Sequence, residues 1–207
     1  MAANPIKDVV VIGGPNGAGK TTAANRLLPE TLHLHEFLNA DEIARGLSPF
    51  EPEGNAVAAG RLMLDRIDNL IGAGKSFAFE TTCAGHRQIK LLRSCRAVGY
   101  RVTLIFLWLP SAQAALARVE KRIAHGGHRI PADVIVRRYA AGLRNMRFGF
   151  LPLADIARVY DNSGDRPALI AEKDPGLALL VHEASQWRLI EEATREELHG
   201  AAARRDD

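Results

Sequence analysis

A glycine-rich stretch near the N-terminus has the spacing that holds phosphate groups. Residues 14–21, "GPNGAGKT", match G-x-x-x-x-G-K-[ST] at every fixed position, between an apolar strand pattern and a helical pattern. The glycines let successive backbone N–H groups point at phosphate oxygens, and the N-terminus of the following helix adds its positive dipole end. The residues assigned to this nucleotide site, for ATP and Mg²⁺, are Gly14, Pro15, Asn16, Gly17, Ala18, Gly19, Lys20, Thr21 and Thr22.

Within this loop Lys20 is expected to reach the outer phosphates, and the Thr21 hydroxyl to bind Mg²⁺. A carboxylate follows 21 residues after Lys20, in "LNADEIARGL", where Asp41 stands at the end of a strand candidate. Ligands of open α/β sheets sit outside the carboxyl ends of the strands, so Asp41 could face the terminal phosphate and accept a hydroxyl proton. The alternative is that Asp41 only caps the next helix, a position for which Asn39 competes.

A second carboxylate ends the next strand pattern, in "FAFETTCAG". Glu80 could hold Mg²⁺ through water or bind a substrate hydroxyl, with Thr81 and Thr82 as neutral polar contacts. The alternative is a plain turn from strand to helix. We assign Glu80 and Thr82 to the substrate and Glu80, with Thr21, to the metal.

Basic residues concentrate between positions 118 and 147. This segment carries a net charge of +6, while the chain as a whole has +3, so the remainder sums to −3. Arg118 and Arg122 share one helix face at i and i+4, and a glycine pair in "HGGHRIP" separates them from a second helix with Arg137 and Arg138. We predict a small helical lid over about 118–147 that clamps phosphates. Arg122 is assigned to the nucleotide and Arg138 to the substrate; a solvated charged face is the alternative.

Short strand patterns alternate with helical ones, which is typical of a parallel sheet flanked by helices. The expected fold is an α/β P-loop NTPase fold with about five parallel strands, similar to that of adenylate kinase. We expect a single domain over residues 1–207. The strand candidates are 9–12, 34–38, 76–80, 100–109, 157–162 and 167–173. The helix candidates are 20–28, 41–47, 55–71, 86–98, 112–124, one from 131, and a C-terminal helix over about 176–200.

The loop sequence is similar to that of ATP-binding cassette ATPases, but the chain has neither their LSGGQ-like signature nor their apolar strand ending in Asp-Glu. It also lacks the N-K-x-D motif with which GTPases bind guanine. Five stretches in order, the loop, "NADEIARGL", "FAFETT", "RVEKRI…GGHRIP…RRY" and "YDNSG", instead resemble the zeta toxin family over roughly residues 7–172. This resemblance implies an ATP-dependent kinase that phosphorylates a sugar hydroxyl of UDP-N-acetylglucosamine. An antitoxin protein is a candidate partner, but the resemblance does not decide whether this chain has one.

The resemblance also implies roles for individual residues. Lys20 and Thr21 would hold ATP and Mg²⁺, and Asp41 would be the general base. Arg118 and Arg129 would be catalytic residues of the lid, and Asn162 would lie beside the adenine. The short segment after residue 84 and the "GGHRIP" corner depart from the cell-wall-targeting toxins, so another nucleotide sugar or small-molecule acceptor stays open.

The composition is ordinary for a soluble globular protein. Two cysteines without metal spacing favour a reducing compartment, and no signal-peptide or membrane-spanning pattern is visible, so a cytoplasmic protein without a membrane partner is expected. A net charge of +3 disfavours nucleic acid as the ligand. The function predicted from these residues is phosphoryl transfer to a small-molecule hydroxyl. An ATPase or nucleotide switch that acts on a protein or nucleic-acid partner is the alternative.

Overall fold

The computed structural model describes residues 6–124 and 130–203, and it is organised around the strand β1 (Lys7–Gly13). β1 pairs in parallel with β3 (Phe77–Thr81) and β4 (Tyr100–Trp108). Its apolar residues alternate between two cores: Val9 and Val11 belong to the larger one, and Val10 and Ile12 to the smaller. A strand covered on both faces must be apolar at every position, which explains the unbroken run in the sequence.

Within the described residues the sheet has seven strands, in the order β2-β3-β1-β4-β5-β6-β7. The other strands are β2 (Phe37–Leu38), β5 (Ile156–Asp161), β6 (Ala168–Lys173) and β7 (Leu180–Val181). Neighbours from β2 to β5 are parallel, whereas β6 and β7 pair antiparallel. The chain changes direction of winding at β1, between β3 and β4. In open α/β sheets such a switch point is where ligands bind.

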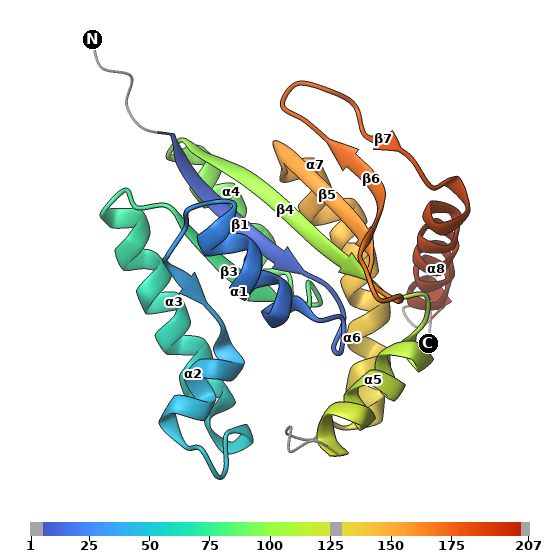
Figure 1. The fold of residues 1–207 in the computed structure, drawn as a ribbon, viewed down its shortest axis with the longest axis horizontal. Helices are drawn as coiled ribbons and strands as arrows, with labels where there is room; N and C mark the ends of the chain where they lie inside the picture. Colours follow the sequence, from blue (N-terminus) through green and yellow to red (C-terminus); the bar gives the residue numbers. More distant parts are fainter. Residues whose placement is uncertain (1–5, 125–129, 204–207) are drawn as a thin grey trace.

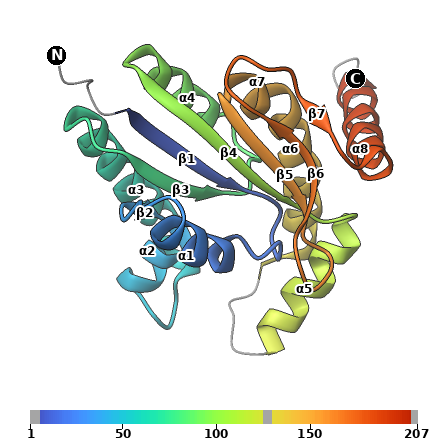
Figure 2. The ribbon, with the colours of Figure 1, turned by 45° about the horizontal axis from the view of Figure 1, so that its top comes forward.

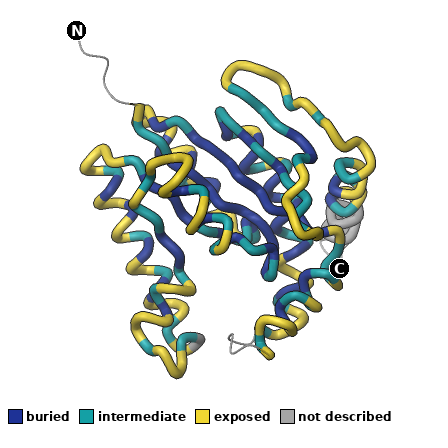
Figure 3. Tube along the Cα trace, viewed as in Figure 1, coloured by how far each residue is buried: buried dark blue, intermediate teal, exposed yellow. Residues whose placement is uncertain are grey.

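Helices cover the sheet unequally (Figures 1 and 2). On one face α1 (Lys20–Glu30) closes the smaller core. The larger core on the other face takes side chains from α3 (Ala56–Gly72), α4 (Arg87–Ala97), α6 (Ala132–Asn145) and α8 (Ala184–Ala203). Figure 3 shows that the strands in the middle are mostly buried, while the outer helices carry the exposed residues.

The remaining helices lie at the edges of this body. α2 (Ala40–Leu47) packs on α3, and α5 (Ala112–Ala124) packs on α6. Three short pieces complete the order of elements: the 3₁₀ turn η1 (Glu53–Asn55), the π-helix η2 (Met146–Phe150) and α7 (Leu151–Leu153). Within the described residues no helix combines the length and the apolar character needed to cross a membrane.

The expected sheet of about five parallel strands is wrong in two respects, because the described part of the chain forms seven strands and the sheet is mixed. β6 returns beside β5 after residues 162–167 only. A parallel return needs a crossover of a dozen or more residues, so a connection this short forces an antiparallel pair. The predicted C-terminal helix over about 176–200 begins later, at Ala184, because β7 and a turn at Gly176 (φ 76°) come first.

One close contact joins α6 to the turn that follows β3. A Cβ atom on Gly142 would lie 2.5 Å from the carbonyl oxygen of Thr82, so only glycine lets the helix approach this closely. One turn further, Asn145 Nδ2 donates hydrogen bonds to the carbonyl oxygens of Cys83 (2.9 Å) and Ala84 (3.1 Å). The turn after Glu80 is therefore held by α6.

Replacing Gly142 by Ala should test this contact. The methyl group must displace the Thr82 carbonyl, so we expect a loss of about 1–3 kcal/mol in the free energy of unfolding, measured by urea denaturation. Gly60→Ala is the matched control, since nothing lies within 4 Å of a Cβ there and helix propensity should add about 0.5–1 kcal/mol. Equal stabilisation of both variants would contradict the close approach.

The two buried cysteines should make the free energy of unfolding depend on pH. Burial raises the pKa of Cys83 from 9.0 to about 12 and that of Cys95 to about 11. From about pH 9 the unfolded chain loses thiol protons that the folded chain keeps, so the free energy of unfolding falls as pH rises, by roughly 1.4 kcal/mol per pH unit for each thiol.

Urea denaturation of the native protein and of Cys83→Ala at about pH 8.5 and about pH 10 measures this effect. The smaller side chain lowers the free energy of unfolding of the variant by the same amount at both pH values. This free energy should, however, fall less steeply with pH than that of the native protein. The same pH slope in both proteins would show that the Cys83 thiol ionises freely in the folded state.

Candidate active site

The phosphate loop connects β1 to α1 in a conformation that needs its glycines. Gly14 has φ 146°, and a Cβ there would lie 2.4 Å from the carbonyl oxygen of Leu107. Gly19, at the start of α1, has φ 79°, a left-handed conformation that L side chains rarely adopt. The loop thus takes a shape whose successive N–H groups can surround an anion at a helix N-terminus.

Lys20 is held at the centre of this loop. Its side chain is 7% exposed, its Nζ donates to the carbonyl oxygen of Pro15 at 3.0 Å, and Glu80 Oε1 lies 3.6 Å away. Burial lowers the pKa of Lys20, while the negative charges of Glu80 and Asp41 oppose this shift. Because the Lys20 ammonium group has lost most of its hydration on burial, a bound phosphate would stabilise its charge strongly.

Glu80 connects the loop to the strand beside it. The β1–β3 register places Ile12 opposite Glu80, which brings the carboxylate to the C-terminal end of β1. Thr21 Oγ1 donates to Glu80 Oε2 at 2.7 Å, and Asn39 Nδ2 donates to the same oxygen at 2.8 Å. The structure therefore brings together Lys20, Thr21 and Glu80, three residues singled out from the sequence.

Sequence reasoning offered Asn39 only as a competitor for the helix cap and missed its bond to Glu80. Its Oδ1 accepts from the backbone N–H of Asp41 (2.9 Å) and of Glu42 (3.3 Å), so Asn39 is the N-cap of α2. Its amide nitrogen binds Glu80 at the same time. The signal was its place at the end of a strand pattern, immediately before the helix with Asp41.

Because Asn39 caps α2, the Asp41 carboxylate is not needed for that role. Asp41 lies in the first turn of α2, is exposed, and is near enough to Lys20 to act on its charge. It lines a pocket of about 380 Å³ between α2 and α6, and Arg138 lines the same pocket from the α6 side. Asp41 and Arg138, both assigned to the substrate from the sequence, thus border one space.

The basic residues of α5 and its neighbours lie at the other side of the loop. A Cβ on Gly17 would lie 2.9 Å from Arg118 Cβ, and the Arg118 guanidinium donates to the carbonyl oxygen of Ser163 at 2.8 Å. Arg122 is exposed one turn further along α5. Arg129 lies outside the described residues. α5 and α6 are the two helices expected for a lid, and closure itself stays a prediction.

Asn162 supports the phosphate loop directly. Its Nδ2 donates to the carbonyl oxygen of Ala18 at 2.7 Å, and its backbone N–H donates to the carbonyl oxygen of Trp108. A Cβ on Gly19 would lie 3.0 Å from this Nδ2. The predicted place beside adenine is untested, but Asn162 clearly fixes the loop against the end of β5.

Two other assigned residues are placed less tightly. Thr82 is half-buried in the turn after β3, and its carbonyl faces Gly142 of α6. Thr22 is exposed in the first turn of α1. Among the described residues no group of three or more His, Cys, Asp or Glu side chains could hold a metal ion without help from a ligand. The oxygen atoms of Thr21 and Glu80 are nevertheless the donor type that Mg²⁺ prefers, and a phosphate can supply the rest.

Solved structures share this fold. The complex of AvrRxo1-ORF1 and AvrRxo1-ORF2 with ATP superimposes with a TM-score of 0.69 at 17% identity, over 91% of this chain and 64% of that chain. The PezAT toxin-antitoxin system of Streptococcus pneumoniae gives 0.61 at 15% identity, over 96% of this chain and 90% of that one. A putative kinase from Chloroflexus aurantiacus gives 0.51 at 18% identity, over 64% and 75%.

At these identities the likeness shows the fold alone, and the chain spans only about 64% of the length of the AvrRxo1 chain that it matches. The sequence itself matches the AAA domain family designated AAA_33 over residues 9–146, from β1 to the start of the π-helix. The match includes the phosphate loop, Asp41, Glu80 and both α5 and α6. The chain therefore belongs to the AAA_33 family of AAA domains and has a P-loop kinase-like fold.

Proposed function

We propose that this protein is an ATP-dependent kinase that transfers the γ-phosphoryl group to a hydroxyl of a small molecule, in the manner of zeta toxins. One observation carries the proposal: an exposed carboxylate, Asp41, is near enough to the buried Lys20 to counteract the lowering of its pKa and borders a pocket, while another residue, Asn39, caps its helix. A carboxylate left without a structural task next to a phosphate site is suited to proton transfer.

The phosphate loop and Lys20 would bind the β- and γ-phosphates of ATP. In the structure Lys20 Nζ is held by the Pro15 carbonyl and Glu80, so its position is set before ATP arrives. The Thr21 hydroxyl and the Glu80 carboxylate would hold Mg²⁺, with Asn39 orienting Glu80. Bound Mg²⁺ would neutralise charge on the phosphates.

Asp41 would act on the acceptor. It takes the proton from the acceptor hydroxyl as that oxygen bonds to the γ-phosphorus, and the bond from phosphorus to the β,γ-bridging oxygen breaks, which releases ADP. Arg118, Arg138 and Arg129 would stabilise the negative charge of the transferring group. The location of Arg118 against Gly17 and of Arg138 on the acceptor pocket supports the first two of these roles.

We propose a nucleotide sugar as the acceptor, and UDP-N-acetylglucosamine is the first compound to test. The pocket beside Asp41, about 380 Å³, has a size found for small-molecule sites. The likeness to a chain solved with ATP and to a toxin-antitoxin system supports ATP as donor and an antitoxin protein as partner. The cytoplasm, where ATP is abundant, is the proposed location.

Asp41→Asn tests the proposed chemistry. Removing the base while keeping the shape should lower the rate of phosphoryl transfer by about 10²- to 10⁴-fold with little change in stability. The measurement is a mass-spectrometric screen for one added phosphoryl group with ATP, Mg²⁺ and a panel of nucleotide sugars, nucleosides and sugars.

Glu42→Gln is the matched control, because Glu42 is the neighbouring exposed acid of α2 and pairs only with Arg45 among the described residues. It should transfer at the native rate. If no acceptor is phosphorylated and both variants hydrolyse ATP as fast as the native protein, the kinase proposal is wrong and the ATPase alternative replaces it.

Lys20→Met tests nucleotide binding separately. Glu80 keeps its hydrogen bonds from Thr21 and Asn39, so the variant should fold. Losing charge-assisted bonds to phosphate should weaken ATP binding by about 10- to 100-fold, measured by calorimetry. Lys75→Met, on the exposed connection before β3, should bind ATP as the native protein does. Native affinity in Lys20→Met would contradict the proposed role of Lys20.

A further inference from the structure

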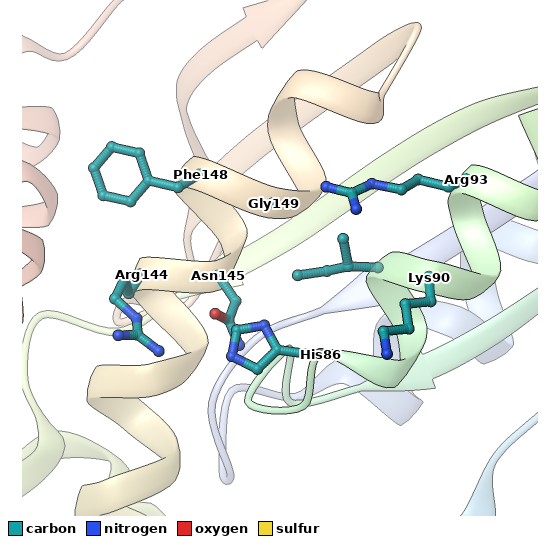
Figure 4. Close-up of a pocket in the computed structure, with 8 residues that line it drawn as sticks. His86, Lys90, Arg93, Arg144, Asn145, Phe148 and Gly149 are labelled. Atoms are coloured by element: carbon teal, nitrogen blue, oxygen red, sulfur yellow. The ribbon is translucent and has the colours of Figure 1, made fainter.

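A second pocket lies away from the phosphate loop, between α4 and the C-terminal part of α6 with the π-helix (Figure 4). It has a volume of about 480 Å³, within the range of small-molecule sites. It shares no lining residue with the phosphate loop or with the pocket beside Asp41. The residues that line it are His86, Ile89, Lys90, Arg93, Arg144, Asn145, Phe148 and Gly149.

The charges of this pocket are all of one sign. Lys90 and Arg93 stand at i and i+3 on α4, so they share a helix face, and Arg144 comes from α6. No carboxylate is among the lining residues, and no acid within the described parts of the chain forms an ion pair with Lys90 or Arg93. Lys90 and Arg93 both border this pocket without a counter-charge among the described residues, so an anion in the pocket would be attracted by both.

The walls of the pocket are fixed by contacts that do not involve these cations. A Cβ on Gly149 would lie 2.4 Å from Ile89 Cδ1, so the π-helix rests directly on α4. Asn145 donates both its amide hydrogen bonds to the carbonyl oxygens of Cys83 and Ala84. The spacing between the two helices is therefore set, and Ile89, which is almost fully buried, gives the floor an apolar character.

We propose that this pocket binds the oxyanion group of a small metabolite, a phosphate ester or a carboxylate, separately from ATP and from the phosphate acceptor. The Arg93 guanidinium can pair with two oxygens of one anion, and the Lys90 ammonium adds a point charge from the same helix face. The His86 ring lies beside Asn145 at the pocket and is a third nitrogen-bearing group there (Figure 4).

The test uses three ligands of one sugar skeleton: glucose 6-phosphate, glucuronate and uncharged glucose. We expect one or both anions, but not glucose, to shift the amide resonances of residues 83–93 and 144–149 in ¹H–¹⁵N spectra. The anion that binds identifies the source of the oxyanion. Lys90→Glu/Arg93→Glu should weaken binding by at least about tenfold, since two attractive charges become repulsive.

Lys75→Glu/Arg188→Glu is the matched control, because it makes the same change in net charge at exposed sites outside the pocket. It should keep native binding, and so should Lys20→Met, in which the phosphate loop is impaired. Lys90→Gln/Arg93→Gln replaces the reversed pair if the latter does not fold, as judged by circular dichroism.

Three results would overturn the proposal. Glucose could bind as well as the anions, the variants at Lys90 and Arg93 could bind as the native protein does, or the shifts could be confined to residues 14–22. The first two mean that the cations of this pocket are simply solvated, and the third means that the anions bind only at the phosphate loop. None of these results depends on whether the protein transfers phosphate.

Discussion

The half-buried carboxylate of Glu80 is the interaction on which the site depends. Its side chain is 11% exposed, and a charge at such a position is costly without partners. Lys20 and Thr21 at the start of α1 and Asn39 at the start of α2 supply these partners, so they come from two other segments of the chain. The same carboxylate thus fixes the start of α1, the start of α2 and the end of β3 relative to one another, at the point where the sheet reverses its winding.

The parts of the site that could be predicted are those that follow from one local pattern. The phosphate loop needs its glycines, its lysine and its threonine at fixed spacing, and these were readable in residues 14–21. Glu80 and Asp41 were singled out as candidates because each ends a strand pattern, and strand ends of a parallel sheet share one edge. β1 was predicted because a strand buried on both faces has no polar residue to interrupt it.

The parts that were missed depend on partners distant in the sequence. Asn39 was recognised as a competitor for the cap, but its bond to Glu80 spans 41 positions and has no local signature. The contact between Arg118 and the Ser163 carbonyl spans 45 positions, and the turn that provides it also reverses the chain and makes β6 antiparallel. β7 is only two residues long and has no recognisable sequence pattern, but it hydrogen-bonds to β6. The last helix therefore begins after β7, at Ala184, and not near residue 176 as predicted.

The fastening of α6 at Gly142 and Asn145 has a mechanical consequence. α6 carries Arg138 on its exposed half, toward the pocket beside Asp41, and its other end is bonded to the turn that follows Glu80. A rigid-body displacement of the helix would drag that turn with it and disturb Glu80. The other half of α6 is held as well, because Ile135 and Tyr139 are buried in the larger core and the Tyr139 hydroxyl donates to the carbonyl oxygen of Leu109 at 2.8 Å. Arg138 is therefore presented to the pocket by a helix that is fixed along its length, and the same helix keeps the turn after Glu80 in place.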